Sequence, residues 1–494
     1  MARNDAGHLR TAGTGASRIS AAALADLLGL WAAPDGPLYR MLATRIGRLA
    51  DTGELPPGLR LPPERELASA LSVSRNTVAM AYQHLRDEGM ARSRQGSGTQ
   101  IVPHRTTPGA VHRANGWFAR VLATADVRID LSMAAVDCAP QVAAALEDPA
   151  TVLDRSARRE IMTGTGYFPY GVPSLRAAIA SVLTTRYGLP TRPAEVLVTT
   201  GGQQGIDLLI RCELAAGQPA IAEDPTFPGG LDALQRSATR LVGVPAGDVA
   251  RLGHALQAHH PGLVYLIPSY QNPVGLSMPL ATRESVVSLA AAHPDVVFID
   301  DMVMADAGLT DAALPPPLAA LAPGLANVVT IGSLSKTYWG GLRTGWIRAP
   351  EGIIARLTAA KSATDLGSTA YQQAVLAAVV AGQHDEIRKW RRDWLRLRYD
   401  ALAGAFRERL PGWTWTPPEG GLTIWARLPG ETDSGAFAEV ALRHGVAVVP
   451  GRLLSVGGSP DAARHVRIAY TRPPGQLAAA AEALAAAGQA GTTG

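Results

Sequence analysis

The run "SLSKTYWGGLRTGW", from Ser333 to Trp346, surrounds a lysine with hydroxyls, glycines, apolar residues and an arginine. Lys336 is one of only three lysines among 46 basic residues, so nearly every other basic residue of the chain is an arginine. A guanidinium stays protonated, whereas a lysine amine beside Arg343 and apolar neighbours can lose its proton and attack a carbonyl carbon. We therefore predict that Lys336 is a reactive amine.

The other two lysines, Lys361 and Lys389, lie in stretches that resemble charged helix faces. We interpret both as solvent-facing residues without a chemical role.

Groups suited to an anion accompany the predicted amine. Ser333, Ser335 and Arg343 offer two hydroxyls and a guanidinium, which suit a phosphate. The run "GGQQG" leads from the strand-like run "EVLVTT" into a helix, whose free N–H groups could also bind phosphate. Taken alone, this pattern is more typical of an ordinary strand-turn-helix connection. The residues at that turn are Gly201, Gly202 and Gln203. An amine with phosphate ligands indicates a phosphorylated aldehyde cofactor.

These groups must be positioned by a sheet. The runs "EVLVTT", "LVYLIP", "VVFID" and "VVTIGS" are short, apolar and separated by alanine-rich helical stretches. This alternation predicts an α/β domain with a largely parallel sheet, whose functional loops lie at the carboxyl ends of the strands. Asp300 and Asp301 follow "VVFI" and would lie at the same edge.

Length and composition set the frame. A chain of 494 residues divides into two or three domains, and 47% apolar with 18% charged residues is typical of a soluble globular protein. We expect a cytoplasmic protein, because no apolar run reaches the ~20 residues of a membrane helix. The two cysteines, Cys138 and Cys212, have neither disulfide nor metal-ligand spacing.

The positive charge is concentrated near the N-terminus. Residues 37–105 hold ten arginines against six acidic residues, while residues 106–494 hold 33 basic and 33 acidic residues. Three helical patterns followed by "ARSRQGSGTQIV" predict a helix-turn-helix and a β-hairpin wing over residues 37–103. Ser74 is a good N-cap of the third helix, whose first turn holds Arg75, Asn76 and Thr77.

The stretch "LPPGLRLPPERELA", the run "VSRNTV" and the wing "GSGT" resemble the winged helix-turn-helix of the GntR family. The resemblance implies binding to double-stranded DNA. It implies phosphate or base contacts for Arg65 and Arg75, major-groove contacts for Ser74 and Thr77, and wing contacts for Arg94 and Gly96.

The motifs "GYFPYGVPSLRAAI", "VLVTTGGQQGIDLL", "AEDPTFPGGLDAL", "PSYQNPVGLSMP", "FIDD" and "GSLSKTYWGGLRTGW" occur in order. Together they resemble the fold-type I aminotransferases, which depend on pyridoxal 5′-phosphate (PLP). A GntR-like reader followed by such a domain is similar to the MocR-type transcriptional regulators. The resemblance also implies a homodimer, because aminotransferase-like active sites form at a subunit interface.

The resemblance assigns roles residue by residue. Lys336 would form the internal aldimine with PLP, and Asp300 would pair with its pyridinium nitrogen. Phe227 would stack on the ring, and Asn272 would bond its 3′-oxygen. The phosphate would be held by Gly202, Gln203, Ser333, Ser335 and Arg343. Either Arg467 or Arg472 would receive a substrate α-carboxylate.

One position departs from the family. Members often carry a tyrosine two residues after the pyridinium aspartate, and Met302 stands there in this chain. Loss of that hydroxyl favours sensing over turnover.

We expect residues 1–36 to be a flexible extension, 37–103 the DNA reader, 104–128 a linker and 129–494 the aminotransferase-like domain. The large subdomain would span about 166–365, and the flanking segments would form the small one. The leading hypothesis is a regulator that senses PLP or an amine effector. The alternatives are an active aminotransferase that carries a DNA reader, and a regulator whose aminotransferase-like domain is only a dimerisation scaffold.

Overall fold

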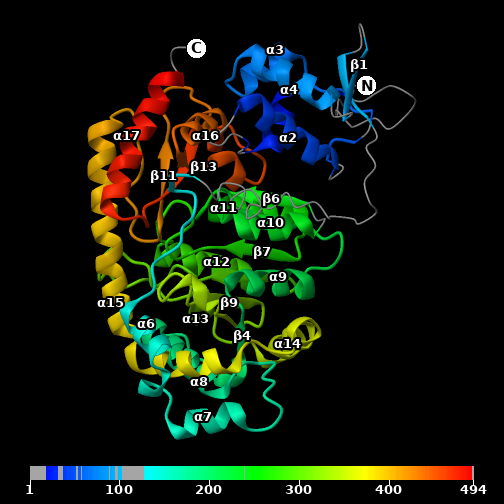
Figure 1. Cartoon of the computed structure of the whole chain (residues 1–494). Helices are drawn as coiled ribbons and strands as arrows, with labels where there is room; N and C mark the ends of the chain where they lie inside the picture. The colour runs from blue at the N-terminus through cyan, green and yellow to red at the C-terminus, as the bar shows by residue number, and fades with distance from the viewer. Residues whose placement is uncertain are drawn as a thin grey trace, which may run out of the picture. The chain divides into compact units, whose positions relative to one another are not determined.

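The computed structural model describes residues 18–29, 31, 37–51, 54–56, 58–87, 90–94, 98–102, 127–237 and 240–491. The chain forms two compact units, and the first ends at Asn115 (Figure 1). Each unit has a hydrophobic core of its own. Most of the predicted linker lies outside the described residues.

Unit 1 is a winged helix-turn-helix, as predicted. Its elements are α1 (Ala21–Leu28), α2 (Leu38–Asp51), α3 (Glu64–Ala70), α4 (Arg75–Asp87), β1 (Ala91–Arg94) and β2 (Gly98–Ile101). The hydroxyl of Ser74 accepts a hydrogen bond from the Thr77 amide at 3.1 Å, which starts α4. Val78, Tyr82 and Leu85 of α4 are buried in the core. Strands β1 and β2 pair antiparallel to form the wing.

The prediction that residues 1–36 are a flexible extension is wrong for the part that the structure describes. Helix α1 packs against α3, and the side chains of Leu24 and Leu28 are fully buried in the unit 1 core with Trp31. Ile19 donates a backbone hydrogen bond to Arg60 at 3.1 Å. The short apolar stripe of α1 covers a core that three helices leave open, and this requirement was not visible in the sequence.

Unit 2 is an α/β unit. Its strands are β3 (Ile129–Asp130), β4 (Val196–Thr199), β5 (Ala220–Glu223), β6 (Leu241–Val244), β7 (Leu263–Leu266), β8 (Val297–Asp301), β9 (Val328–Ser333), β10 (Gly345–Arg348), β11 (Thr423–Arg427), β12 (Val446–Ala447), β13 (Val449–Pro450) and β14 (His465–Ala469). Its α-helices are α6 (Pro140–Glu147), α7 (Arg155–Met162), α8 (Pro173–Tyr187), α9 (Gly202–Glu213), α10 (Pro228–Arg236), α11 (Val249–His259), α12 (Leu280–Ala292), α13 (Leu318–Leu321), α14 (Glu351–Asp365), α15 (Ala370–Arg409), α16 (Ser434–Arg443) and α17 (Pro474–Gly491).

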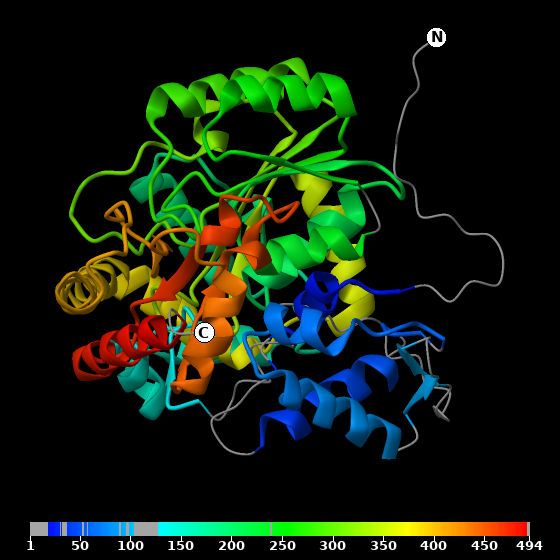
Figure 2. The same cartoon turned by 90° about the horizontal axis from the view of Figure 1, so that it is seen from above.

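The main sheet has the strand order β4-β10-β9-β8-β7-β5-β6. Strand β10 is antiparallel to both of its neighbours, and the pairs from β9 through β6 are parallel. Helices lie on both faces of this sheet (Figure 2). The four strands predicted from the sequence are β4, β7, β8 and β9, so the α/β prediction is confirmed.

Alternate residues of each central strand face opposite cores. Phe298 of β8 packs in the core that contains α8, α12 and α13, whereas Ile299 packs in the core that contains α9 and α14. A second sheet, β11-β14-β13, is built from the C-terminal third of the chain. The long helix α15 packs against α8, which covers the main sheet, and against α17, which lies along it near the second sheet (Figure 1).

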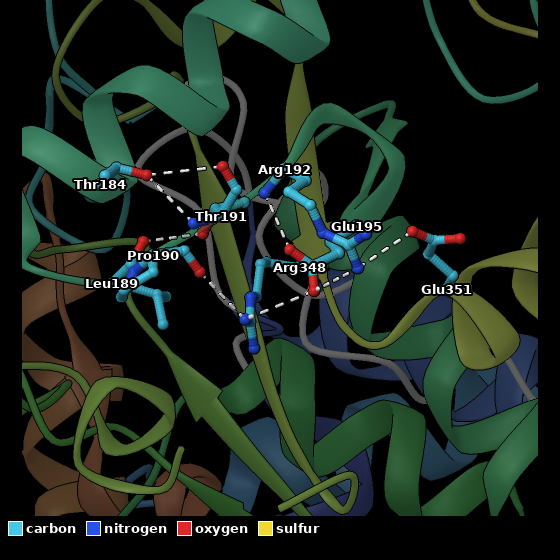
Figure 3. A network of polar contacts seen from close by, with 8 residues as sticks. All are labelled: Thr184, Leu189, Pro190, Thr191, Arg192, Glu195, Arg348 and Glu351. Atoms are coloured by element: carbon cyan, nitrogen blue, oxygen red, sulfur yellow. Dashed lines mark hydrogen bonds and ion pairs between the residues drawn. The ribbon is translucent and has the colours of Figure 1, made fainter. Parts of the chain in front are cut away.

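A polar network fixes β4 to β10 at the end of these strands remote from Lys336 (Figure 3). Arg348 lies 3.9 Å from the Glu195 carboxylate and donates to the Pro190 carbonyl at 3.2 Å. Arg192 bridges the carboxylates of Glu195 and Glu351 at 3.4 and 3.0 Å. The network links the segment before β4 to the last residue of β10 and to the start of α14.

None of the helices in the described ranges combines the length and the apolar character needed to cross a membrane.

Candidate functional site

Lys336 lies in the turn after β9, with its amine buried. Its Nζ donates a hydrogen bond to the carbonyl of Ala134 at 2.7 Å. Burial lowers the pKa of Lys336, the charges of Arg467 and Arg343 add to this effect and Asp301 opposes it, which together bring the pKa to about 8. The amine is therefore partly neutral near neutral pH, which fits the predicted nucleophile.

The carboxylate that faces Lys336 is Asp301, and the prediction of Asp300 for this place is corrected. Asp301 accepts a hydrogen bond from the Tyr265 hydroxyl at 2.6 Å and another from the Val303 amide at 2.8 Å. Its charge acts on Lys336, and burial raises its pKa to about 6.

Asp300 points to the opposite face of the sheet, because side chains alternate along a strand. It accepts a hydrogen bond from the Leu318 amide at 2.8 Å, and its nearest charge is the buried Arg283. Arg283 is itself held by backbone carbonyls, including that of Pro268 at 2.7 Å. This pair is part of the packing between β8, α12 and α13.

With Asp301 in the place predicted for Asp300, the position at which family members often carry a tyrosine becomes Val303 instead of Met302. Residues 302 to 304 are Met, Val and Met, so no hydroxyl follows Asp301 at any of these three positions. Val303 borders the site, because a Cβ added to Gly202 would lie 2.8 Å from its Cγ2.

The start of α9 forms a cradle open to an anion. Gly201 precedes the helix with φ +100°, a conformation that favours glycine. A Cβ at Gly201 would lie 2.9 Å from an Arg343 guanidinium nitrogen, and the same guanidinium donates to the Thr200 carbonyl at 2.8 Å. The backbone N–H groups of the first turn and the Arg343 cation therefore lie side by side.

Two hydroxyls extend the cradle. Ser333 Oγ lies 2.9 Å from Ser335 Oγ and 3.1 Å from the Thr344 carbonyl. A Cβ at Gly202 would be 3.9 Å from Ser333 Cβ, which places these serines beside the helix start. The structure thus brings the predicted phosphate ligands together.

The predicted ring contacts approach from the neighbouring strands. Phe227 precedes α10, and a Cβ at Gly229 would touch both its ring and Gln203. The Gln203 side chain donates to the Gly229 carbonyl at 2.8 Å. Asn272 is buried, and its Oδ1 has no hydrogen-bond partner among the described residues. A buried polar atom without a partner indicates a place for a ligand group.

Arg467 and Arg472 are not equivalent. Arg467 is buried, donates to the Ser132 carbonyl at 2.6 Å and acts electrostatically on Lys336. Arg472 donates to the Asp130 carbonyl at 2.9 Å, its side chain is 40% exposed, and it is absent from the charges that act on Lys336. Of the two candidates, Arg467 is the one near the amine.

Four further residues around this site escaped the sequence-based prediction. Tyr265 is fully buried and holds Asp301, although the two are far apart in sequence. Lys361 is also buried, contrary to the solvent-facing interpretation, and pairs with Asp365 at 2.9 Å. Asp365 accepts from Gln204 at 3.2 Å, and Gln204 in turn accepts from the Thr200 amide. Lys361 therefore supports the turn before α9.

The predicted DNA contacts lie at the start of α4 and on α3. Arg65, Arg75 and Asn76 are exposed. The Ser74 hydroxyl lies 2.8 Å from the Thr77 hydroxyl and also caps α4, so part of its hydrogen-bonding capacity is used inside the unit. Arg94 is the last residue of β1, and nothing is described of its side chain, while Gly96 lies outside the described residues.

The residues present fit PLP. The glycine cradle with Arg343 suits a phosphate, Asn272 has a buried oxygen without a partner among the described residues, and Lys336 supplies the amine. Asp301 adds a buried carboxylate whose charge acts on Lys336.

The lowered pKa of Lys336 makes the stability of unit 2 depend on pH. The pKa is about 8 in the folded chain against the ordinary 10.5, so between these values the unfolded chain binds more protons and the free energy of unfolding rises with pH. In the cofactor-free protein, Lys336→Met is expected to abolish this rise and to stabilise the unit by about 1–3 kcal/mol at pH 7. Thermal unfolding of both proteins from pH 7 to 10.5 measures the difference, and parallel profiles would contradict the prediction.

A family model described as aminotransferase class I and II matches residues 132–484, more than half of the chain. The chain belongs to the aminotransferase class I and II family. A second model, bacterial regulatory proteins of the gntR family, matches residues 38–101. This combination makes the protein a MocR-type regulator.

Two regulators are similar to most of this chain, and a solved aminotransferase structure is similar to unit 2. The HTH-type transcriptional regulator YisV of Bacillus subtilis is 29% identical over 84% of this chain and 89% of its own length. The probable rhizopine catabolism regulatory protein MocR of Rhizobium meliloti is 27% identical over 84% and 87%. The crystal structure of LysN, the α-aminoadipate aminotransferase of Thermus thermophilus in complex with N-(5′-phosphopyridoxyl)-L-leucine, is 26% identical, covers 76% of this chain and 95% of LysN, and has a TM-score of 0.67.

Proposed function

We propose that this MocR-type protein binds double-stranded DNA through unit 1 and PLP through unit 2, and that unit 2 senses PLP or an amino compound. The proposal rests on one observation, which is that Lys336, Asp301 and Arg343 lie close together at one edge of the main sheet. An amine with a pKa of about 8, a buried carboxylate and an anion cradle are the three groups that a phosphorylated pyridine aldehyde requires.

Each residue has a distinct task in this proposal. Arg343, the first turn of α9 and the hydroxyls of Ser333 and Ser335 bind the phosphate, and Phe227 and Val303 give the ring apolar contacts. Asp301, oriented by the Tyr265 hydroxyl, carries the charge opposite the ring nitrogen. The side-chain N–H group of Asn272 donates to the ring oxygen, and its buried Oδ1 remains available to accept from a ligand donor. When bound, PLP supplies an electrophilic carbon and a ring that accepts electrons.

Arg467 gives the site its preference for amino acids. Its buried guanidinium lies near Lys336 and can bind a carboxylate with two parallel hydrogen bonds. Lys336, when neutral, can accept or return a proton beside that carboxylate. Because residues 302–304 offer no hydroxyl, the site favours binding of an amino compound over its conversion to product.

The test is the visible absorption spectrum of the purified protein with PLP, next to Lys336→Ala, before and after addition of single amino acids. We expect a band that requires Lys336 and that one amino acid converts to a stable new band. A band that bleaches and returns with a keto acid would favour the active aminotransferase instead. Absence of any band that depends on Lys336 would refute the cofactor assignment.

A homodimer is the assembly we propose for the MocR-type protein. Tyr167, Leu366 and Tyr371 are large apolar side chains that are 64%, 53% and 53% exposed. They belong to one neighbourhood, since a Cβ at Gly367 would lie 2.8 Å from the carbonyl of Phe168. Exposed apolar groups that gather in this way are typical of an interface. Light scattering that gives the mass of a monomer at micromolar concentration would refute this assembly.

The salt bridge at the start of α4 predicts how DNA affinity responds to substitution. Arg75 Nε lies 3.1 Å from the Glu64 carboxylate, so Glu64 competes with a phosphate for this cation. We expect Arg75→Ala to weaken binding to a generic duplex about tenfold and to reduce the salt dependence, and Glu64→Gln to strengthen binding. Fluorescence anisotropy at two salt concentrations measures both effects. Gln83→Ala, two turns further along α4, is the control, and an equal loss in that variant would contradict the assignment.

A further inference from the structure

A second cavity of unit 2 lies apart from the Lys336 site. It has a volume of about 780 Å³, which is within the range of small-molecule sites. Its walls come from the end of α8, the loop 305–316, the middle of α15 and the residue Tyr270. The seven charged residues that line it are Arg186, Asp306, Asp311, Asp385, Arg388, Lys389 and Arg392.

Most of these charges are already paired. Asp306 receives hydrogen bonds from Arg388 at 2.7 Å and from the Tyr187 hydroxyl. Arg388 also lies 3.5 Å from Asp385. Arg392 forms an ion pair with Asp311, so all three carboxylates of the cavity have a cation.

The charges that are left over are both positive. Within the described part of the chain, neither Arg186 nor Lys389 makes a hydrogen bond or an ion pair. Arg186 lines the cavity beside Tyr187 and Tyr270, and its charge acts to lower the pKa of both hydroxyls. The four cations and three carboxylates of the lining leave a net charge of +1. A concave site with net positive charge and two cationic side chains that have no partner among the described residues attracts an anion.

Tyr270 adds a hydroxyl donor to the cavity, and its backbone has a positive φ. Its hydroxyl has no hydrogen-bond partner among the described residues, although its side chain is largely buried and lines the cavity. Its φ is +51°, which costs a bulky residue about 1–3 kcal/mol. Such strain concentrates at ligand sites, and Tyr270 lines this cavity.

We propose that this cavity binds a small organic anion, whose carboxylate or phosphate group is held by Arg186, Lys389 and the Tyr270 hydroxyl. This site is separate from the proposed PLP site and does not depend on it. Cationic donors around a partly enclosed cavity form charge-assisted hydrogen bonds with such a group.

The cavity shares its walls with the loops that carry the Lys336 site. Tyr270 lies two residues before Asn272, and Asp306 lies five residues after Asp301. The Tyr338 hydroxyl, two residues after Lys336, lies 2.9 Å from His384 Nδ1, and His384 Nε2 lies 3.7 Å from Asp306. An anion bound in the cavity would therefore lie against the two loops that carry Asn272 and Asp301.

The experiment is calorimetric titration of the full chain with succinate, citrate and inorganic phosphate, each in turn. We expect saturable binding of at least one probe. The dissociation constant of phosphate, compared with those of succinate and citrate, tells whether the site prefers a phosphate or a carboxylate group. Arg186→Ala/Lys389→Ala is expected to weaken this binding at least about tenfold, the loss of one or two charge-assisted hydrogen bonds. Both side chains are exposed, so the double variant keeps the fold.

Two controls locate the site. Arg396→Ala removes an exposed arginine of the same helix outside the cavity, and Arg343→Ala disables the proposed phosphate cradle of PLP. Arg396→Ala is expected to bind each probe like the wild type. Arg343→Ala is expected to keep the succinate and citrate binding that the double variant weakens, because these probes are compared apart from phosphate, which can also enter the Arg343 cradle. The proposal is overturned if no probe binds, if the double variant binds equally well, or if Arg343→Ala alone abolishes binding.

Discussion

Asp301→Asn is expected to weaken PLP binding by roughly a hundredfold or more. Asp301 is the buried carboxylate whose charge acts on Lys336, and its orientation is fixed by the Tyr265 hydroxyl at 2.6 Å. In the proposed complex Asp301 pairs with the pyridinium nitrogen of PLP, and removing one partner of a buried ion pair costs about 3 kcal/mol or more, because the other charge stays buried without compensation. The dissociation constant of PLP, followed by visible absorption, measures the loss.

Asp300→Asn is the matched control, because it makes the same chemical change one residue earlier. Asp300 faces Arg283 and the start of α13, so its loss should lower the thermal stability of unit 2 and leave PLP affinity within about threefold of the wild type. The reversed order, with Asp300→Asn losing the cofactor and Asp301→Asn retaining it, would contradict the assignment.

Leu24→Asp is expected to unfold unit 1 and to abolish DNA binding. Leu24 of α1 is fully buried in the core that also supports α3 and α4. Replacing a buried leucine removes about 2–5 kcal/mol of apolar packing, and the new carboxylate must be desolvated as well. The sum is comparable to the whole stability of a small domain.

Calorimetry of the full chain separates the two units. We expect the transition of unit 1 to disappear in Leu24→Asp while that of unit 2 and any PLP-dependent absorption stay unchanged. Ala22→Asp, at an exposed position of the same helix, should retain DNA binding. If Leu24→Asp still binds DNA like the wild type, α1 is not part of the functional unit.

A third measurement links both units to regulation. The proposed sensor requires that PLP or an amino compound change the affinity of unit 1 for DNA, since a ligand alters an equilibrium only by binding its two states differently. The DNA titration of the wild type with and without PLP, next to Lys336→Ala, measures that difference.

The sequence by itself determined the two-domain organisation, the α/β class and the loops that carry the site. Strand-like runs and glycine turns are local features that can be identified from the order of the residues. The rarity of lysine is a feature of the composition, and it drew attention to Lys336. Lys336, Ser333 and Arg343 were recognisable because they lie in one short stretch.

Only the tertiary structure decided which neighbour in a pair belongs to the site. Asp300 and Asp301 are adjacent carboxylates, and their faces are set by what packs on each side of β8. Arg467 was separated from Arg472 in the same way, by burial near Lys336. Helix α1 joined unit 1 because three helices leave its core uncovered. Each of these choices depends on contacts between segments distant in sequence, which periodicity along a single segment does not specify.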